Sequence, residues 1–196
     1  KFNRAFLASP HLKEALELMN PNVAKVYELA LKVTDDKIVP DMAEEAALVT
    51  EYDRLMSEMD FRFRGKSMPL STLRKYFDDS ERNVRRQAME CAGRRMERDS
   101  KKLDLLFDKL VKVRARMAKK MGLPSYAVMG DMLMGRYSYG RKEIRAFADE
   151  TAANVTPLIA ALKERIARTL GIDKIMLYDN ETYFIGGNPE PDKSAK

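Results

Sequence analysis

Apolar residues recur at three- and four-residue spacing through most of the chain, the pattern typical of amphipathic helices. Three short helices are predicted in the first 60 residues, opening at Ser9-Pro10, Asn20-Pro21 and Pro40-Asp41, because proline is favoured in the first helical turn after a small polar cap. Asp35-Asp36 is predicted to break the second helix. The apolar stripe of the third consists of Leu48, Tyr52, Leu55 and Met59.

The dominant periodic stretch starts at Ser80 and reaches Met121. No proline interrupts it from Glu81 onward, and its only glycine is Gly93. If it is one continuous helix, it is about 60 Å long at about 1.5 Å per residue. Gly122 and Pro124 are predicted to end it, and Ser125 to cap the next helix, through Leu133 or Met134.

A second long helix is predicted from about Gly140 to Leu170, ended by Gly171. Pro157 lies inside it and predicts a kink near Thr156. Its predicted buried stripe consists of Ile144, Phe147, Thr151, Val155, Leu158, Leu162, Ile166 and Leu170.

Two segments predict short β structure. In 61–70, Phe61 and Phe63 alternate with arginines before Gly65-Lys66, which predicts a short hairpin, and Ser71 is predicted to cap a short helix after it. The run "KIMLYD" at 174–179 predicts a short strand. The expected fold class is mainly α: a multi-helical lobe with one or two very long helices, a short β-hairpin near 61–70 and a short strand near 174–179.

Charge is distributed unevenly along the 196 residues, whose net charge is +6. Residues 1–60 contain seven basic and twelve acidic residues, residues 61–120 nineteen and eight, and residues 121–196 ten of each. We expect an acidic helical segment at 1–60, a long-helix lobe at 61–171 and a strand-and-turn tail at 172–196, joined in one compact body. The basic middle could meet an acidic partner or the acidic first segment of its own chain.

Candidate catalytic and metal-ligating residues are few. The chain has one histidine, His11, and one cysteine, Cys91, whereas zinc sites draw mostly on several such side chains. A serine triad would have to use His11, and no phosphate loop occurs. Acidic pairs, such as Asp78-Asp79, fall at helix starts or on polar faces. We therefore expect no catalytic and no metal-binding residue here, and the single cysteine favours a reducing, cytoplasmic compartment.

The basic cluster of the long helix allows two interpretations. Lys109, Lys112, Arg116 and Lys120 share one stripe, away from Leu110, Val113 and Met117. This stripe either faces solvent and the acidic opening helices, or it binds nucleic acid. Nucleic-acid binders usually add a reading or stacking device, which the sequence lacks, so we expect no nucleic-acid partner. No apolar run approaches the roughly 20 residues of a membrane span, so we expect no membrane partner either.

Four runs carry a resemblance to a known family: "FRGKSMPLSTLRKYFDDSERNVRRQAMECAGR", "LDLLFDKLVKVRARMAKKMGLPSYAVMGDMLMGRYSY", "VTPLIAALKERIARTLGIDKIMLYD" and "FIGGNPEP". In this order they resemble the non-catalytic front half of the M3-family zinc oligopeptidases, the oligoendopeptidase F group. The most specific parts are S-x-R-x-V-R-x-x-A at 80–88 and the stretch 110–126. The matching segments span about Phe61 to Pro191.

The resemblance implies a helical, two-lobed metalloprotease whose deep cleft admits oligopeptides and whose zinc motif, His-Glu-x-x-His, lies further along the chain. We therefore expect a fragment that is inactive alone, with zinc in the parent enzyme and no cofactor here. By the same resemblance, Arg136, Tyr137 and Tyr139 are candidates for cleft lining, although packing at a helix end explains them equally well. A fragment of this kind could associate with a second copy. The alternative function is a stand-alone helical interaction module whose basic middle binds an acidic partner or nucleic acid.

Overall fold

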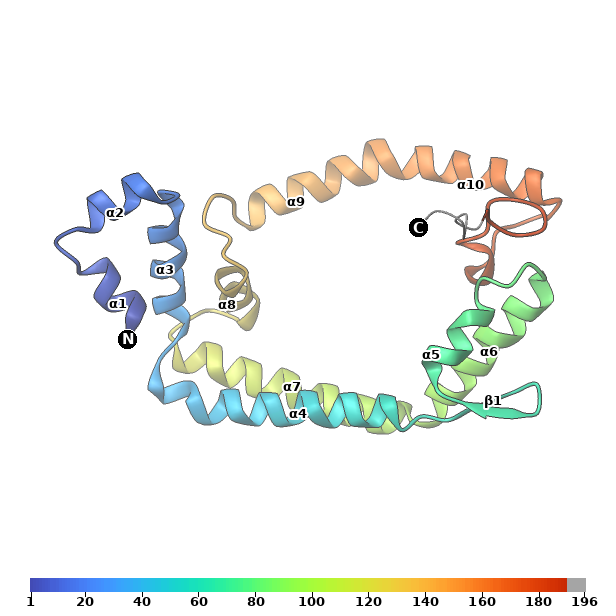
Figure 1. Ribbon diagram of the computed structural model, residues 1–196, viewed down its shortest axis with the longest axis horizontal. Coiled ribbons are helices and arrows are strands. Elements are labelled where there is room, and N and C mark those ends of the chain that lie inside the picture. Colours follow the sequence, from blue (N-terminus) through green and yellow to red (C-terminus); the bar gives the residue numbers. More distant parts are fainter. Residues whose placement is uncertain (190–196) are drawn as a thin grey trace, which may run out of the picture. The chain divides into compact units, whose positions relative to one another are not determined.

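A computed structural model describes residues 1–189, and the expected mainly α fold with one hairpin is confirmed (Figure 1). The described residues form two compact units, each built from two separate stretches of chain. Unit 1 comprises Lys1–Glu51 and Asp104–Ala148, and unit 2 comprises Tyr52–Leu103 and the chain from Asp149 onward. These bounds do not coincide with the segments 1–60, 61–171 and 172–196 expected from composition, whose last seven residues lie outside the described part.

Unit 1 begins with three short helices, α1 (Phe2–Leu7), α2 (Leu12–Leu18) and α3 (Asn22–Val33). Helix α1 was not predicted. It contacts α3 through Phe2 and Phe6, whose rings meet Tyr27 edge-on at centroid distances of 6.0 and 5.3 Å. The predicted start of α2 at Ser9-Pro10 is early, because the Ser9 hydroxyl accepts from the His11 amide at 3.2 Å and the helix begins only at Leu12.

A 3₁₀ turn, η1 (Asp36–Ile38), leads into α4 (Val39–Ser57), which lies beside α7 (Ser100–Lys120) in Figure 1. Leu48 of α4 forms a small buried cluster with Leu106 and Val113 of α7. A second cluster joins the ends of α3, η1, α7 and α8, and consists of Val33, Ile38, Met117, Ala118 and Met129. Unit 1 thus has two small cores.

The end of α7 follows the prediction. Gly122 has φ +72°, and the amide of Leu123 donates to the Ala118 carbonyl at 2.9 Å, the pattern of a glycine-terminated helix. Ser125 then caps α8 (Tyr126–Leu133) by accepting from the Val128 amide at 3.4 Å. These signals are local, so the sequence contains all the information that they need.

Unit 2 is built on the predicted hairpin, β1 (Phe61–Phe63) paired antiparallel with β2 (Lys66–Met68). The turn is Arg64-Gly65, with φ +50° and +76°, instead of Gly65-Lys66. The short helix that follows comprises α5 (Leu70–Leu73) and η2 (Arg74–Tyr76), and it starts after Pro69, so Ser71 is not its cap. The apolar face of the hairpin packs with α5 and α6 in a core of Met59, Phe61, Phe63, Met68, Leu73, Val84, Ala88 and Ala92.

The prediction of a single helix from Ser80 to Met121 is wrong, because the structure has two helices there. Helix α6 (Arg82–Arg98) ends at Asp99, whose φ of −100° and ψ of 6° are not helical, and α7 starts at Ser100. The Asp99 carboxylate accepts from Arg95 and pairs with Lys102 Nζ at 3.3 Å, and its carbonyl accepts from the Lys102 and Leu103 amides. Aspartate and serine both form such local hydrogen bonds that compete with a continuous helix.

The second long helix spans 30 residues as α9 (Arg141–Glu150), a π-helical turn η3 (Thr151–Val155) and α10 (Thr156–Leu170). The π turn ends two residues before Pro157, which has no amide hydrogen to donate, and the kink near Thr156 stays a prediction. The Asn154 side chain donates to the Glu150 carbonyl at 3.1 Å. Gly171, with φ +65°, ends the helix as predicted.

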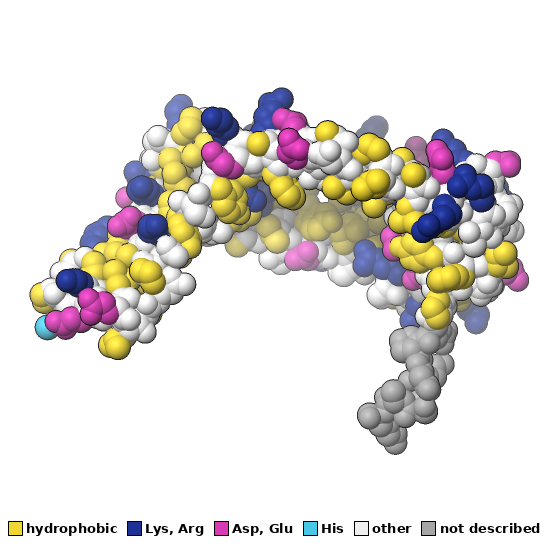
Figure 2. All heavy atoms as spheres, turned by 90° about the horizontal axis from the view of Figure 1, so that it is seen from above, with side chains coloured by type: hydrophobic (Ala, Val, Ile, Leu, Met, Phe, Trp, Pro, Cys, Tyr) yellow, Lys and Arg dark blue, Asp and Glu magenta, His cyan; other side chains and the backbone are white. Residues whose placement is uncertain are grey.

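The expectation that one side of this helix is buried is wrong for most of its length. Phe147 is 74% exposed, Leu158 69% and Val155 45%. Hydrophobic side chains at the surface of the α9–α10 stretch are visible in Figure 2. Helical periodicity identifies an apolar stripe, but it does not show which part of a protein covers that stripe.

The strand predicted at 174–179 is also wrong. The segment is an irregular chain followed by a 3₁₀ turn, η4 (Leu177–Asp179). A short apolar run forms a strand only where a partner strand is available, and the sole pairing among residues 1–189 is β1 with β2. In the same residues, no helix is both long and apolar enough to cross a membrane.

Candidate functional site

In unit 1, three side chains of the basic middle meet acidic residues of α4. Asp41, 3% exposed, accepts from Arg116 Nε and from Lys120 Nζ, both at 2.6 Å. Arg116 also pairs with Glu44, and Arg114 Nε donates to Glu45 Oε1 at 2.6 Å. We call these residues the Asp41 network. Hydrogen bonds from Lys120 and Arg116 hold the pKa of Asp41 below its usual value, against the effect of burial.

The basic stripe of α7 contacts acidic residues of the same chain. All four side chains are exposed, but Arg116 and Lys120 pair with the acidic helix α4 of the same chain, whereas Lys109 and Lys112 form no ion pair with a described residue. The acidic first segment therefore neutralises part of the basic middle, and half of the stripe has no acidic partner among residues 1–189.

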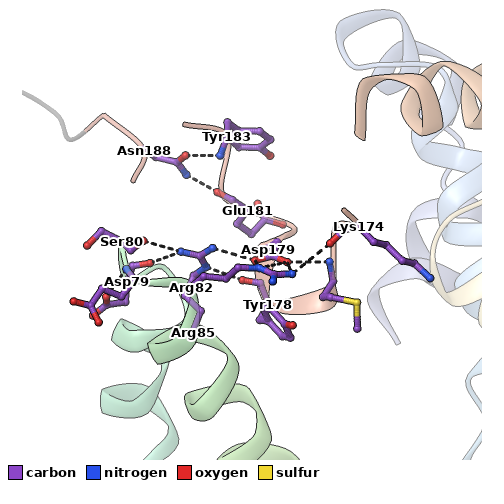
Figure 3. A network of polar contacts seen from close by, with 12 residues as sticks. Asp79, Ser80, Arg82, Arg85, Lys174, Tyr178, Asp179, Glu181, Tyr183 and Asn188 are labelled. Atoms are coloured by element: carbon purple, nitrogen blue, oxygen red, sulfur yellow. Dashed lines mark hydrogen bonds and ion pairs between the residues drawn. The ribbon is translucent and has the colours of Figure 1, made fainter. Parts of the chain in front are cut away.

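In unit 2, the two arginines of the quoted 80–88 motif bind one buried aspartate (Figure 3). Asp179 is 1% exposed and accepts from Arg82 Nη2 at 2.8 Å and from Arg85 Nη2 at 3.0 Å. Arg85, 3% exposed, also donates to the Tyr178 carbonyl at 2.9 Å and to the Asp79 and Ser80 carbonyls at 2.7 and 3.1 Å. These residues form the Asp179 network.

Burial alone would raise the pKa of Asp179, but hydrogen bonds from Arg82, the Met176 amide and Arg85 outweigh it and hold the pKa below its usual value. A cavity of about 140 Å³ lies beside the two arginines, lined also by Thr182 and Phe184. Each of the three guanidinium nitrogens of Arg85 is already used within the chain. The Asp179 network therefore fixes the segment after α10 onto the start of α6, and its buried arginine offers nothing to a ligand.

The predicted cleft residues follow the end of α8, where Gly135 has φ +67°. Arg136 Nη1 donates to Asp131 Oδ1 at 2.6 Å, and its guanidinium carbon lies 6.0 Å from the centre of the Tyr139 ring. Tyr137 lies instead beside Lys25 of α3, with Nζ 5.5 Å from its ring centre. The structure brings Arg136 and Tyr139 together and directs Tyr137 elsewhere. A role for any of them in a cleft stays a prediction.

Two further arginines, which the sequence did not single out, join Arg136. Arg141 Nε pairs with the other oxygen of Asp131 at 3.1 Å, and Arg145 lies one helical turn further along α9. With Ile144 and Ala148 these side chains line a recess of about 410 Å³, the arginine recess. Its signal in the sequence is the four-residue spacing of Arg141 and Arg145, which identifies a helix face but not a recess.

The described residues form no zinc site. Within 1–189, no three His, Cys, Asp or Glu side chains are grouped so that they could hold a metal ion. His11 Nδ1 lies 3.0 Å from Glu14 at an exposed helix start, and the Cys91 thiol donates to the Arg62 carbonyl at 3.4 Å. The described residues do not fit the zinc that the family resemblance implies for a parent enzyme.

No protein-family profile and no curated protein matches the chain. Solved structures do. A putative oligoendopeptidase F from Bacillus anthracis str. Ames is 27% identical with a TM-score of 0.88, covering 99% of this chain and 36% of that one. A second putative oligoendopeptidase F is 28% identical with a TM-score of 0.90, covering 99% and 34%. PZ peptidase A, solved with an inhibitor, is 27% identical with a TM-score of 0.90 and the same coverage.

The resemblance to the oligoendopeptidase F group is thereby confirmed. The match covers nearly all of this chain, the acidic first 60 residues included. The chain spans about a third of the length of the solved structures that it matches.

Proposed function

We propose that this chain is the non-catalytic helical lobe of an M3-type zinc metallopeptidase that hydrolyses oligopeptides in a cleft. The observation that supports this most strongly is the structural match to oligoendopeptidase F over 99% of the chain, together with 27–28% sequence identity. In this proposal, residues outside this chain would hold the zinc ion, which would supply the Lewis-acid chemistry of peptide hydrolysis.

The described residues have a supporting part in such an enzyme. Because they do not fit a zinc site, no step of hydrolysis is assigned to them. The Asp41 and Asp179 networks hold chain segments together within the two units, and Arg136 and Tyr139 remain the candidates for contact with substrate. The chain alone is accordingly expected to be inactive.

The alternative, an interaction module whose basic middle binds an acidic partner, has less support. Arg114, Arg116 and Lys120 already bind Glu45, Asp41 and Glu44 of the same chain. Nucleic-acid binding of this kind would be steeply salt-dependent and would respond to Lys112→Glu, because Lys112 is exposed. If neither added salt nor Lys112→Glu weakens the binding of nucleic acid, this alternative function is excluded.

The experiment compares this chain with the same chain extended by whatever coding sequence follows Lys196. Zinc is measured by mass spectrometry, and peptidase activity with an internally quenched oligopeptide. We expect no stoichiometric zinc and no cleavage by the 196-residue chain, and both in the extended protein. Stoichiometric zinc bound tightly by the 196-residue chain would overturn the proposal.

A further inference from the structure

We infer that the arginine recess binds the terminal carboxylate of a peptide, with Arg145 as its principal contact. This inference rests on the proposed function and deepens it, since it names the part of an oligopeptide that this lobe would recognise. The geometry that supports it lies entirely within unit 1, between the end of α8 and α9.

Charge in the recess is unbalanced. Three guanidinium groups line it, those of Arg136, Arg141 and Arg145, and Asp131 is the only carboxylate among the lining residues. Asp131 is divided between two of them, with Arg136 Nη1 at 2.6 Å and Arg141 Nε at 3.1 Å from its two oxygens. The recess therefore carries two positive charges that its own carboxylate does not neutralise, which favours an anionic ligand.

The donors needed for an anion are free. Arg145 is exposed, and its guanidinium makes no hydrogen bond or ion pair with any described residue. Arg141 uses only Nε on Asp131, so its two terminal nitrogens remain available. A guanidinium presents paired N–H donors whose spacing matches the two oxygens of a carboxylate.

The surroundings favour a peptide over a small inorganic anion. Ile144 and Ala148 line the same recess, which gives it an apolar wall beside the arginines. Tyr139, half exposed, is held against Arg136, and Leu133 and Met134 are exposed on the chain that leads to it. A ligand with one anionic end and apolar side chains fits this mixture, and an oligopeptide with a free carboxyl terminus is such a ligand.

The test uses two peptides that differ only in ending with a carboxylate or a carboxamide. Binding of each to the 196-residue chain is measured by calorimetry, and the Michaelis constant for each is measured on the extended, active protein. We expect the carboxylate peptide to bind about tenfold tighter, the magnitude of a charged hydrogen bond at a partly exposed site. Arg145→Gln should remove this preference without changing binding of the carboxamide peptide.

Lys142→Gln is the matched control, because Lys142 is exposed on the same helix but does not line the recess. It removes the same charge and should keep the tenfold preference. Equal effects of the two substitutions, equal binding of the two peptides, or competition by inorganic phosphate as strong as by the carboxylate peptide would each overturn the inference. An extended protein without peptidase activity, combined with a preserved binding preference of the 196-residue chain, would refute the proposed function alone.

Discussion

Asp41 of unit 1 and Asp179 of unit 2 are each buried between two cationic side chains, but the cations differ in their access to water. Arg116 and Lys120, which hold Asp41, have side chains that are 43% and 39% exposed. Of the pair that holds Asp179, Arg82 is 42% exposed, whereas Arg85 is 3% exposed. A cation that keeps its hydration loses little when its partner is removed. A buried cation loses its only counter-charge, so the Asp179 network should be the more vulnerable of the two.

The largest effect is expected for Asp179→Asn. The amide retains the shape but leaves the charge of Arg85 buried without a counter-charge, which should lower the free energy of unfolding by about 3 kcal/mol or more. Urea unfolding followed by circular dichroism measures this loss. Asp173→Asn, the same change at an exposed neighbour, should stay within about 0.5 kcal/mol of the unmodified chain. Similar urea midpoints for the two variants would show that Arg85 does not depend on Asp179.

A matched arginine-to-lysine pair should sharpen the comparison. Arg85→Lys removes the fork that reaches Asp179 and three backbone carbonyls at once, and should cost about 2 kcal/mol. Arg116→Lys should shift the urea midpoint far less, because Lys120 still holds Asp41 and water can solvate the new ammonium group. If Arg116→Lys lowered the free energy of unfolding as much as Arg85→Lys, the two networks would not differ in vulnerability.

Asp41→Asn should destabilise the chain less than Asp179→Asn does, and its effect should depend on salt concentration. We expect faster amide hydrogen exchange in peptides from α4 and α7, with little change in α6. Because Arg116 and Lys120 are partly exposed, salt screens their attraction to Asp41. In 0.5 M NaCl, the exchange rates of the variant and of the unmodified chain should therefore differ less. Asp53→Asn, at an exposed position of the same helix, is the control. Faster exchange in α6 alone would contradict the assignment of Asp41 to unit 1.

The smallest expected effect is in the dependence of stability on pH. The pKa values of Asp41 and Asp179 are both lowered in the folded chain, so the stability that they contribute is fully present above about pH 4, the usual range of an aspartate, and is lost as pH falls through the lower folded values. The urea midpoint should therefore differ less between pH 6 and pH 3 in Asp41→Asn and in Asp179→Asn than it does in the unmodified chain. A variant with an unchanged pH difference would show that its aspartate is not paired in solution.

Helix ends were predictable where their signals are adjacent in sequence. Ser125 caps α8, and Gly122 and Gly171 end α7 and α10, because a capping hydroxyl or a left-handed glycine acts over a few residues. The split at Asp99 had an equally local signal, in Asp99-Ser100. The long apolar periodicity on both sides of this pair obscured it.

Contacts between distant segments were not predictable in the same way. The apolar run in 174–179 favoured a strand, but Asp179 is held by arginines more than 90 positions earlier, and no periodicity indicates such a pairing. The contact of the basic middle with α4 was anticipated as one of two alternatives, because a net charge of −5 beside one of +11 is a property of composition.

The candidate site was partly accessible from sequence. Arg136, Tyr137 and Tyr139 were chosen from the family resemblance, and the structure joins two of them. The contributions of Arg141 and Arg145 depend on the turn after α8, which brings α9 back to Asp131. That turn includes the left-handed Gly135, a conformation that the sequence alone did not predict.

The hairpin of unit 2 has a consequence for aggregation. A two-stranded sheet has two unpaired edges, and such edges can recruit strands from neighbouring molecules into cross-β stacks. On β1, the outward carbonyl of Arg62 already accepts a hydrogen bond from the Cys91 thiol. Just before the strand, the Asp60 carbonyl accepts from Arg95 Nε at 3.2 Å. β2 has the exposed, charged Lys66 and is only three residues long. The strands in the described part of the chain are thus poor templates for fibril growth.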